Sequence, residues 1–272
     1  MKKNEQNKIF DIKNKTIIIT GSAGRLGTEF SHTLSSSGAN TILFDLNYKK
    51  NAKLESVLTK QYNTKPMAYT VDITNENELV KVVKDVKKKY GKIDCLVNSA
   101  FLSPTNSKES FSTSFEKFPK DLWDQAISVN LTGIFLCCKT VGQVMAKQRH
   151  GVIVNISSIY GILGADQRIY GTSKLNSSVS YAASKGGVVN LTRYLAAYWH
   201  GKNIRVNTMS LGGVLDKSYM SKEFIKNYSA KTILNRMANK NEYNGALLFL
   251  VSDASSYVTG TNLVIDGGWS AW

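Results

Sequence analysis

Tyr181 and Lys185 stand four positions apart in the segment YAASK, a spacing that puts both side chains on one face if the segment is helical. A tyrosine hydroxyl, with a reference pKa of about 10, is a poor base at neutral pH unless its anion is stabilised. A lysine ammonium one helical turn away would provide that stabilisation. The pair therefore predicts proton transfer at an oxygen, which a hydride transfer at the attached carbon requires.

Three glycines follow an apolar stretch in the segment TGSAGRLG, each three positions from the next. Because glycine has no Cβ, such a turn lets a pyrophosphate lie against backbone N–H groups and the positive end of a helix dipole. A tight strand-to-helix turn can also use glycines for structural reasons alone. Its position in the first strand–helix unit favours a dinucleotide site, formed by Gly21, Ser22, Gly24, Arg25, Leu26 and Gly27.

Asp45 stands 18 residues after Gly27, at the end of the second apolar stretch. A carboxylate there can accept hydrogen bonds from the adenosine ribose hydroxyls and would repel a 2′-phosphate, so NAD is favoured over NADP. NADP stays open because Arg25, Lys49 and Lys50 are close in sequence and could bind a phosphate. The alternative interpretation of Asp45 is an acidic residue that only stabilises its turn.

Short apolar stretches alternate with longer amphipathic ones along the chain. Strands are predicted at residues 16–20, 41–44, 67–71, 95–98, 152–156, 204–209 and 262–265. Helices are predicted at residues 29–37, 53–60, 76–90, 121–148, 181–200 and 241–251. This alternation predicts an α/β protein with a single-domain, doubly wound Rossmann fold, in which about seven parallel strands carry helices on both faces.

The predicted Rossmann-type domain covers residues 15–272 and follows a polar N-terminal extension, residues 1–14. Two segments interrupt its rhythm: a turn-rich insertion at 161–180 and a basic, helical lid at 216–236. Both follow predicted strands, so both should lie over the carboxyl edge of the sheet, where ligands bind in such folds. The lysines of the lid fit a solvated helix better than a phosphate site.

From about Lys15 to Trp269 the sequence resembles the short-chain dehydrogenase/reductase family. YAASK matches the family's YxxxK, and the segments NIRVN, VTG and DGG follow in the family's order. The resemblance implies that Ser158 orients the substrate oxygen and that Asn130 holds a water that relays protons to Lys185. It also implies a hydride-transferring enzyme whose catalytic residues are Asn130, Ser158, Tyr181 and Lys185.

The same resemblance extends the predicted cofactor site. Asp72 corresponds to the adenine-contacting acid, and NSAF at residues 98–101 to the family's NNAG, with Phe101 in place of the glycine. The implied contacts beyond the glycine turn and Asp45 are Asp72, Ile73, Asn98, Ala100, Tyr181, Lys185, Gly212 and Val214.

A second pair with the same spacing, Tyr170 and Lys174, competes with the first. It begins 12 residues after Ser158, nearer to common family spacing than the 23 residues that separate Ser158 from Tyr181. However, Gly171 and a turn-like continuation surround Tyr170, whereas Tyr181 begins a sustained helical pattern. Tyr181 is therefore the predicted proton-transferring residue, and Tyr170 is predicted to border the substrate.

Two departures from the family pattern help to indicate a subgroup within the family. The glycine turn has GxxGxxG spacing, and Leu211 replaces the usual proline before Gly212. With the insertion before YAASK, the turn and NSAF are similar to bacterial oxidoreductases linked to flagellin modification and nonulosonic-acid sugars. The insertion's hydrogen-bonding side chains suit a small, polyhydroxylated, sugar-like substrate. The predicted substrate contacts are Ser158, Gln167, Tyr170 and Tyr181.

Composition sets the remaining expectations. The net charge is +15, but lysine supplies 29 of the 35 positive charges and is dispersed, so neither a nucleic-acid nor a membrane partner is predicted. Three cysteines, without zinc-site spacing, predict no disulfide framework and no metal site, and they fit a reducing cytoplasm. The family resemblance implies a homodimer or homotetramer.

Two alternatives remain at this point. One is a 3-oxoacyl-carrier-protein or small-alcohol reductase, whose acidic carrier would meet the basic lid, although Asp45 disfavours the NADPH that reductive biosynthesis usually uses. The other is a non-catalytic Rossmann protein that binds a dinucleotide and RNA. A pure binding protein has no need of a reactive tyrosine and lysine.

Overall fold

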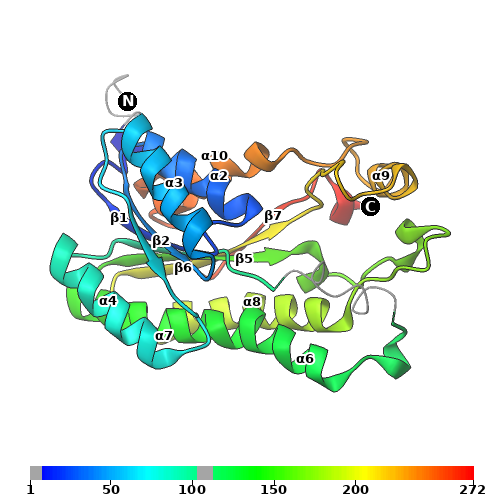
Figure 1. Cartoon of the computed structure of the whole chain (residues 1–272), viewed down its shortest axis with the longest axis horizontal. Coiled ribbons are helices and arrows are strands. Elements are labelled where there is room, and N and C mark those ends of the chain that lie inside the picture. Colours follow the sequence, from blue (N-terminus) through cyan, green and yellow to red (C-terminus); the bar gives the residue numbers. More distant parts are fainter. Residues whose placement is uncertain (1–7, 103–112) are drawn as a thin grey trace.

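The seven apolar stretches form one parallel sheet in the computed structural model, which describes residues 8–102 and 113–272 (Figure 1). The spatial order is β3-β2-β1-β4-β5-β6-β7, with parallel pairing throughout. The strands are β1 (Thr16–Thr20), β2 (Asn40–Asp45), β3 (Met67–Thr70), β4 (Cys95–Asn98), β5 (Gly151–Ser158), β6 (Ile204–Leu211) and β7 (Asn262–Ile265). The predicted doubly wound Rossmann fold is confirmed.

Helices cover both faces of the sheet, because successive strand residues point to opposite sides. Ile18 packs in the core beneath α4, α7 and α8, whereas Ile17 and Ile19 pack in the core beneath α2, α3 and α10 (Figure 1). The helices are α2 (Arg25–Ser36), α3 (Tyr48–Gln61), α4 (Glu76–Tyr90), α6 (Lys120–Ile127), α7 (Ile134–Gln148), α8 (Val179–Tyr198), α9 (Lys222–Ser229) and α10 (Asn244–Val251).

Strand order reverses at β1, whose neighbours are β2 and β4. The connections that leave the carboxyl ends of β1 and β4 therefore diverge and open a crevice, which is where doubly wound sheets bind ligands. The glycine turn follows β1, the NSAF segment spans the end of β4, and Ser158 ends β5. The fold thus brings three of the predicted motifs to one edge of the sheet.

Three local features differ from the sequence prediction. A π-helical turn at Ser128–Gly133 interrupts the helix predicted at 121–148. The extension is partly packed, since Ile12 is 1% exposed and belongs to the core under α2. In the lid, α9 occupies only Lys222–Ser229, and turns make up much of the rest.

The helical stretch Lys120–Gln148 is the one helix of the described residues that has the length and composition of a membrane span. Half of its most apolar window is buried inside the protein. Leu136, Cys137 and Val141 of this stretch belong to the core between α7, α8 and the sheet. Its apolar character is accounted for by this packing.

Candidate active site

The glycine turn leaves no room for a side chain at Gly21 or Gly27. Gly21 has φ +65°, and a Cβ built on it would lie 2.6 Å from Cα of Ala100 at the end of β4. A Cβ on Gly27 would overlap the Gly21 carbonyl. The first N–H groups of α2 receive no side-chain cap from Gly24, whereas Asn47 and Asn75 cap α3 and α4. An uncapped helix start behind a turn with glycine at its most crowded positions fits a dinucleotide pyrophosphate.

Ser22 positions this turn through its side chain. Its hydroxyl is buried and donates to Oδ1 of Asn51 at 2.7 Å. The Asn51 amide donates in turn to the carbonyls of Leu43 (2.9 Å) and Tyr69 (3.1 Å). Sequence reasoning missed Asn51, whose signal is an amide on the otherwise apolar inner face of α3.

Side chains also join the strand ends on either side of the crevice. Oγ1 of Thr20 accepts from the backbone N–H groups of Ser99 and Ala100, both at 3.1 Å. The Asn98 amide donates to Oδ1 of Asn155 at 2.8 Å, so it joins β4 to β5 inside the sheet. Ala100 therefore lies at the turn as expected, whereas the Asn98 side chain points into the protein. Thr20 and Asn155 were not singled out from the sequence.

Of the two predicted adenosine-side acids, Asp45 ends β2 and Asp72 follows β3. Asp45 accepts from the N–H groups of Ala23 (2.9 Å) and Asn47 (2.8 Å), so the turn-stabilising role is present. A carboxylate has about four acceptor positions, which leaves capacity for ribose hydroxyls. Asp72 accepts from Thr74, through its backbone N–H at 2.8 Å and its hydroxyl at 2.7 Å. The neighbouring side chain of Ile73 is buried.

The segment after β6 forms the far side of the crevice. Gly212 donates its N–H to the Ile265 carbonyl at 2.9 Å, and a Cβ on it would lie 2.8 Å from Cα of Asp266. Val214 forms a parallel bridge to Ala238. These contacts fix the backbone of the predicted cofactor residues Gly212 and Val214. Leu26 packs against the core under α2.

Tyr181 and Lys185 lie one turn apart near the start of α8, as their spacing predicted. The ammonium nitrogen of Lys185 is buried, donates to the Ile156 carbonyl at 2.9 Å and lies 5.8 Å from the centre of the Tyr181 ring. Burial lowers the pKa of Lys185 to about 8, because an ammonium loses hydration there. The lysine is thus easier to deprotonate than a solvated one.

The phenol of Tyr181 is buried beside Ser158. Burial raises the pKa of Tyr181, and a hydrogen bond with Ser158 acts in the opposite direction. The Lys185 ammonium donates to the Ile156 carbonyl, and the stabilisation of the phenolate by Lys185 stays a prediction. Ser158, which also accepts from the N–H of Tyr160 at 3.2 Å, is the contact that favours the phenolate.

Phe101 and Asn130 complete the surroundings of this pair. The Phe101 ring meets the Tyr181 ring edge-on, with centroids 5.7 Å apart, and lies 5.7 Å from the Lys185 nitrogen. Asn130 is buried in the π-helical turn, and its Oδ1 accepts from the Leu102 N–H at 2.7 Å. Asn130 therefore fixes the segment that carries Phe101. The water relay implied for Asn130 stays a prediction.

The competing tyrosine does not share a helix with its lysine. Tyr170 ends a 3-10 turn (Gln167–Tyr170), and Gly171 and Lys174 after it both have positive φ. Its ring packs against Phe224 of α9 at 5.3 Å. The predicted substrate residue Gln167 accepts from the Ser177 N–H at 2.7 Å, which closes the insertion on itself.

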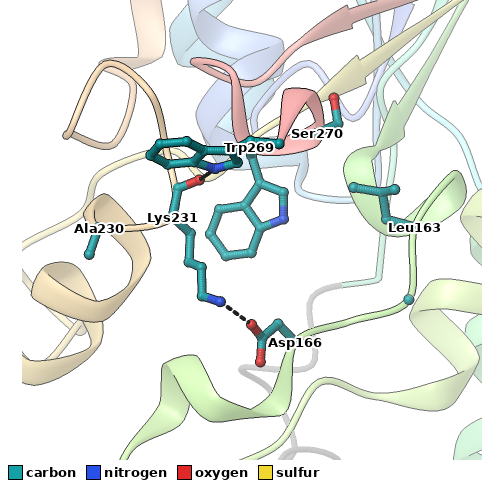
Figure 2. Close-up of a pocket in the computed structure, with 8 residues that line it drawn as sticks. Leu163, Asp166, Ala230, Lys231, Trp269 and Ser270 are labelled. Carbon is teal, nitrogen blue, oxygen red and sulfur yellow. Dashed lines mark hydrogen bonds and ion pairs between the residues drawn. The ribbon is translucent and has the colours of Figure 1, made fainter.

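A groove of about 600 Å³ lies between the insertion, the end of the lid and the C-terminal turn (Figure 2). Trp269 stands in its wall, and the ion pair between Lys231 and Asp166, at 2.9 Å, crosses it (Figure 2). Behind Trp269, the ring of Tyr228 lies 4.4 Å away, in a cluster that also includes Tyr160 and Tyr170. The groove therefore brings an aromatic side chain and an ion pair together.

Comparison with known proteins decides the family. A family model described as enoyl-(acyl carrier protein) reductase matches residues 21–270, a span that includes the glycine turn, YAASK and DGG. The chain belongs to the short-chain dehydrogenase/reductase family. It is an oxidoreductase of this family, and the family resemblance of its motifs is confirmed.

Relatives in the short-chain dehydrogenase/reductase family match over nearly their whole length. An NAD-dependent glycerol dehydrogenase of Listeria innocua is 32% identical over 97% of each chain. The post-translational flagellin modification protein A of Campylobacter coli is 30% identical over 95% of this chain and 99% of its own. A gluconate 5-dehydrogenase from Burkholderia cenocepacia, solved with NADP and tartrate, has 26% identity and a TM-score of 0.87 over 97% and 98% of the chains.

These relatives are named for the use of a nicotinamide dinucleotide and for small-molecule substrates. The relatives include both NAD- and NADP-linked proteins.

Proposed function

We propose that this enzyme is an NAD-linked dehydrogenase or reductase that acts on a carbonyl or hydroxyl carbon of a small, sugar-like substrate. The observation that carries the proposal is the placing of Tyr181, Lys185 and Ser158 at the same sheet edge as the glycine turn. Proton-transferring groups thus face the crevice in which a doubly wound sheet binds a dinucleotide.

The residues divide the work by their chemistry. The bound nicotinamide would accept or supply the hydride. Tyr181 would move the proton at the substrate oxygen, and Ser158 would orient that oxygen and stabilise the phenolate by hydrogen bonding. Lys185 would act as a nearby cation whose lowered pKa lets it exchange protons near neutral pH. Asn130 would hold the relaying water.

The cofactor contacts are proposed on the same grounds. The turn from Gly21 to Gly27 would hold the pyrophosphate, and Asp45 would accept from the adenosine ribose. Asp45 supports NAD, because its carboxylate is anchored at the end of β2 and would repel a 2′-phosphate.

The substrate class is inferred from the predicted substrate residues and from the groove beside the insertion. Ser158, Gln167 and Tyr170 carry hydroxyl and amide groups, and Trp269 stands in the wall of the groove. Aromatic faces beside hydrogen-bonding groups suit hydroxylated rings and chains better than a long acyl chain. The similarity to a glycerol dehydrogenase and to a gluconate dehydrogenase supports a polyol or sugar acid.

The test is a fluorescence assay of NADH and NADPH turnover with purified protein and a panel of polyols, sugar acids, sugar phosphates and nucleotide sugars. We expect oxidation of a polyol or reduction of a keto sugar, faster with the NAD pair. A 3-oxoacyl thioester turned over faster than every sugar would replace the proposed substrate class. Dinucleotide binding without turnover of any substrate would contradict the proposed enzyme activity.

A further inference from the structure

Arg25 connects two parts of the protein that the sheet keeps apart. It belongs to the glycine turn and begins α2, yet its Nη2 lies 2.8 Å from Oδ2 of Asp216 in the lid. Its guanidinium carbon also lies 5.0 Å from the centre of the Tyr219 ring. β4 and β5 separate β1 from β6 in the sheet. The contact therefore crosses the carboxyl edge of the sheet.

Asp216 is held for this contact by its own turn. Its Oδ1 accepts from the backbone N–H of Ser218 at 2.9 Å and from the Ser218 hydroxyl at 2.5 Å, which directs Oδ2 toward the arginine. Farther along the lid, Glu223 accepts from the N–H and hydroxyl of Thr172. The lid is thus attached to the insertion by α9 and to the cofactor turn by Arg25.

The negative charges of Asp216 and of a bound pyrophosphate explain why an arginine is favourable at position 25. A pyrophosphate at the uncapped start of α2 would lie near the Asp216 carboxylate, and two anions in one crevice repel each other. A guanidinium between them offsets this repulsion. It carries five N–H donors, more than the contact with Asp216 uses, and can bond two oxyanions at once.

We propose that Arg25 is shared between the cofactor pyrophosphate and Asp216, so that dinucleotide binding orders the lid over the substrate site. This rests on the proposed function, in which the glycine turn binds the dinucleotide. Arg25 is then a binding residue for the cofactor, and Asp216 is a positioning residue that acts through it. Because binding linkage is reciprocal, an ordered lid would also retain the cofactor.

The experiment measures hydrogen exchange of residues 216–229 and dinucleotide affinity, with NAD⁺ and NADP⁺ as probes, in the full-length protein. In the wild type, the dinucleotide should slow exchange in the lid. Arg25→Leu should weaken binding about tenfold, the loss expected for one charge-assisted contact, and should abolish the slowing. Arg25→Lys should restore part of the affinity, because a cation is retained.

Asp216→Asn should also abolish the slowing, with a smaller loss of affinity than Arg25→Leu. Its matched control is Asp253→Asn, which removes a carboxylate that pairs with Lys15 at 3.1 Å at the other edge of the sheet. Thermal unfolding checks that each variant folds. If Arg25→Leu does not fold, the Arg25→Lys and Asp216→Asn variants test the proposal in its place.

The proposal is overturned if Asp216→Asn keeps the full slowing, or if Arg25→Leu binds as tightly as Asp253→Asn. Failure of the proposed function looks different, since the wild type would then bind neither dinucleotide.

Discussion

The ammonium nitrogen of Lys185 lies 5.8 Å from the centre of the Tyr181 ring, one turn farther along α8. The lysine donates to the Ile156 carbonyl, so its charge would act on a phenolate through space and not through a hydrogen bond. Ser158 makes the direct contact with the phenol. Substitutions of Tyr181, of Lys185 and of the glycine turn should therefore change different quantities. These are turnover, the pH dependence of stability and dinucleotide binding.

Tyr181→Phe should reduce kcat by about 10²–10⁴-fold, the usual contribution of a positioned acid or base. Dinucleotide binding should persist, because the phenyl ring keeps its packing against Phe101. Tyr170→Phe is the matched control and should mainly alter KM. Steady-state kinetics and cofactor fluorescence measure both effects. The opposite pattern would assign the proton transfer to Tyr170.

Lys185→Met should change how stability depends on pH. The folded pKa of Lys185, about 8, is below its ordinary value of 10.5, so between these values the unfolded chain binds more protons. Stability from this residue is therefore present above pH 10.5 and is lost as pH falls to about 8. The unfolding free energy of wild type minus variant should rise with pH in that window, by at most about 1.4 kcal/mol per unit. Urea unfolding measures it, and a flat difference would contradict the burial argument.

Gly21→Ala should destabilise the protein more than Gly91→Ala. Both glycines have positive φ, which costs an alanine about 1 kcal/mol. At Gly91 nothing lies within 4 Å of a Cβ, whereas at Gly21 the Ala100 backbone lies 2.6 Å away. The extra cost should be about 1–3 kcal/mol in urea unfolding, with loss of dinucleotide binding. Equal effects of the two substitutions would mean that the turn is not a tight cradle.

Asp45→Ser should shift cofactor preference toward NADP. The serine removes the charge that would repel a 2′-phosphate and the acceptor for the ribose hydroxyls. The ratio of kcat/KM for NAD over that for NADP should fall about tenfold, the effect of one charged contact. Thermal unfolding is the control, because Asp45 also accepts from Ala23 and Asn47. An unchanged ratio would leave Asp45 with its turn-stabilising role alone.

The strands and the Tyr181–Lys185 pair could be predicted because their signals are local. Apolar stretches of strand length identify buried parallel strands, and the four-residue spacing identifies one helix face. The π-helical turn at Ser128–Gly133 could not be predicted: Asn130 within it bonds the Leu102 N–H, a partner remote in sequence. The direction of the Lys185 ammonium likewise depends on the Ile156 carbonyl of another element.

The crevice likewise combines a turn that a local sequence pattern predicts with contacts between distant residues that no local pattern predicts. The glycine spacing predicted the turn, but Asn51, which holds it through Ser22, has backbone partners on two other strands. Arg25 was predicted as a cofactor residue from its place in the turn. Its ion pair with Asp216 depends on how the lid folds back over the sheet, which no local pattern encodes.

The homo-oligomer implied by family resemblance can be tested on α8. Tyr194 and Tyr198 are 63% and 67% exposed, and their rings stack 6.0 Å apart. Phe135 of the neighbouring α7 is also exposed. Exposed aromatic side chains such as the stacked Tyr194 and Tyr198 are typical of an interface. Tyr194→Glu with Tyr198→Glu would place two charges in that contact and should lower the molar mass measured by sedimentation.

Tyr48→Glu is the matched control, because Tyr48 is 69% exposed on α3, on the opposite side of the sheet. It should leave the molar mass unchanged. Burying two unpaired carboxylates costs more free energy than most interface side chains contribute to association. The double variant should therefore dissociate in part at micromolar concentration. An oligomer equally stable in the double variant would show that copies of the chain meet through another surface.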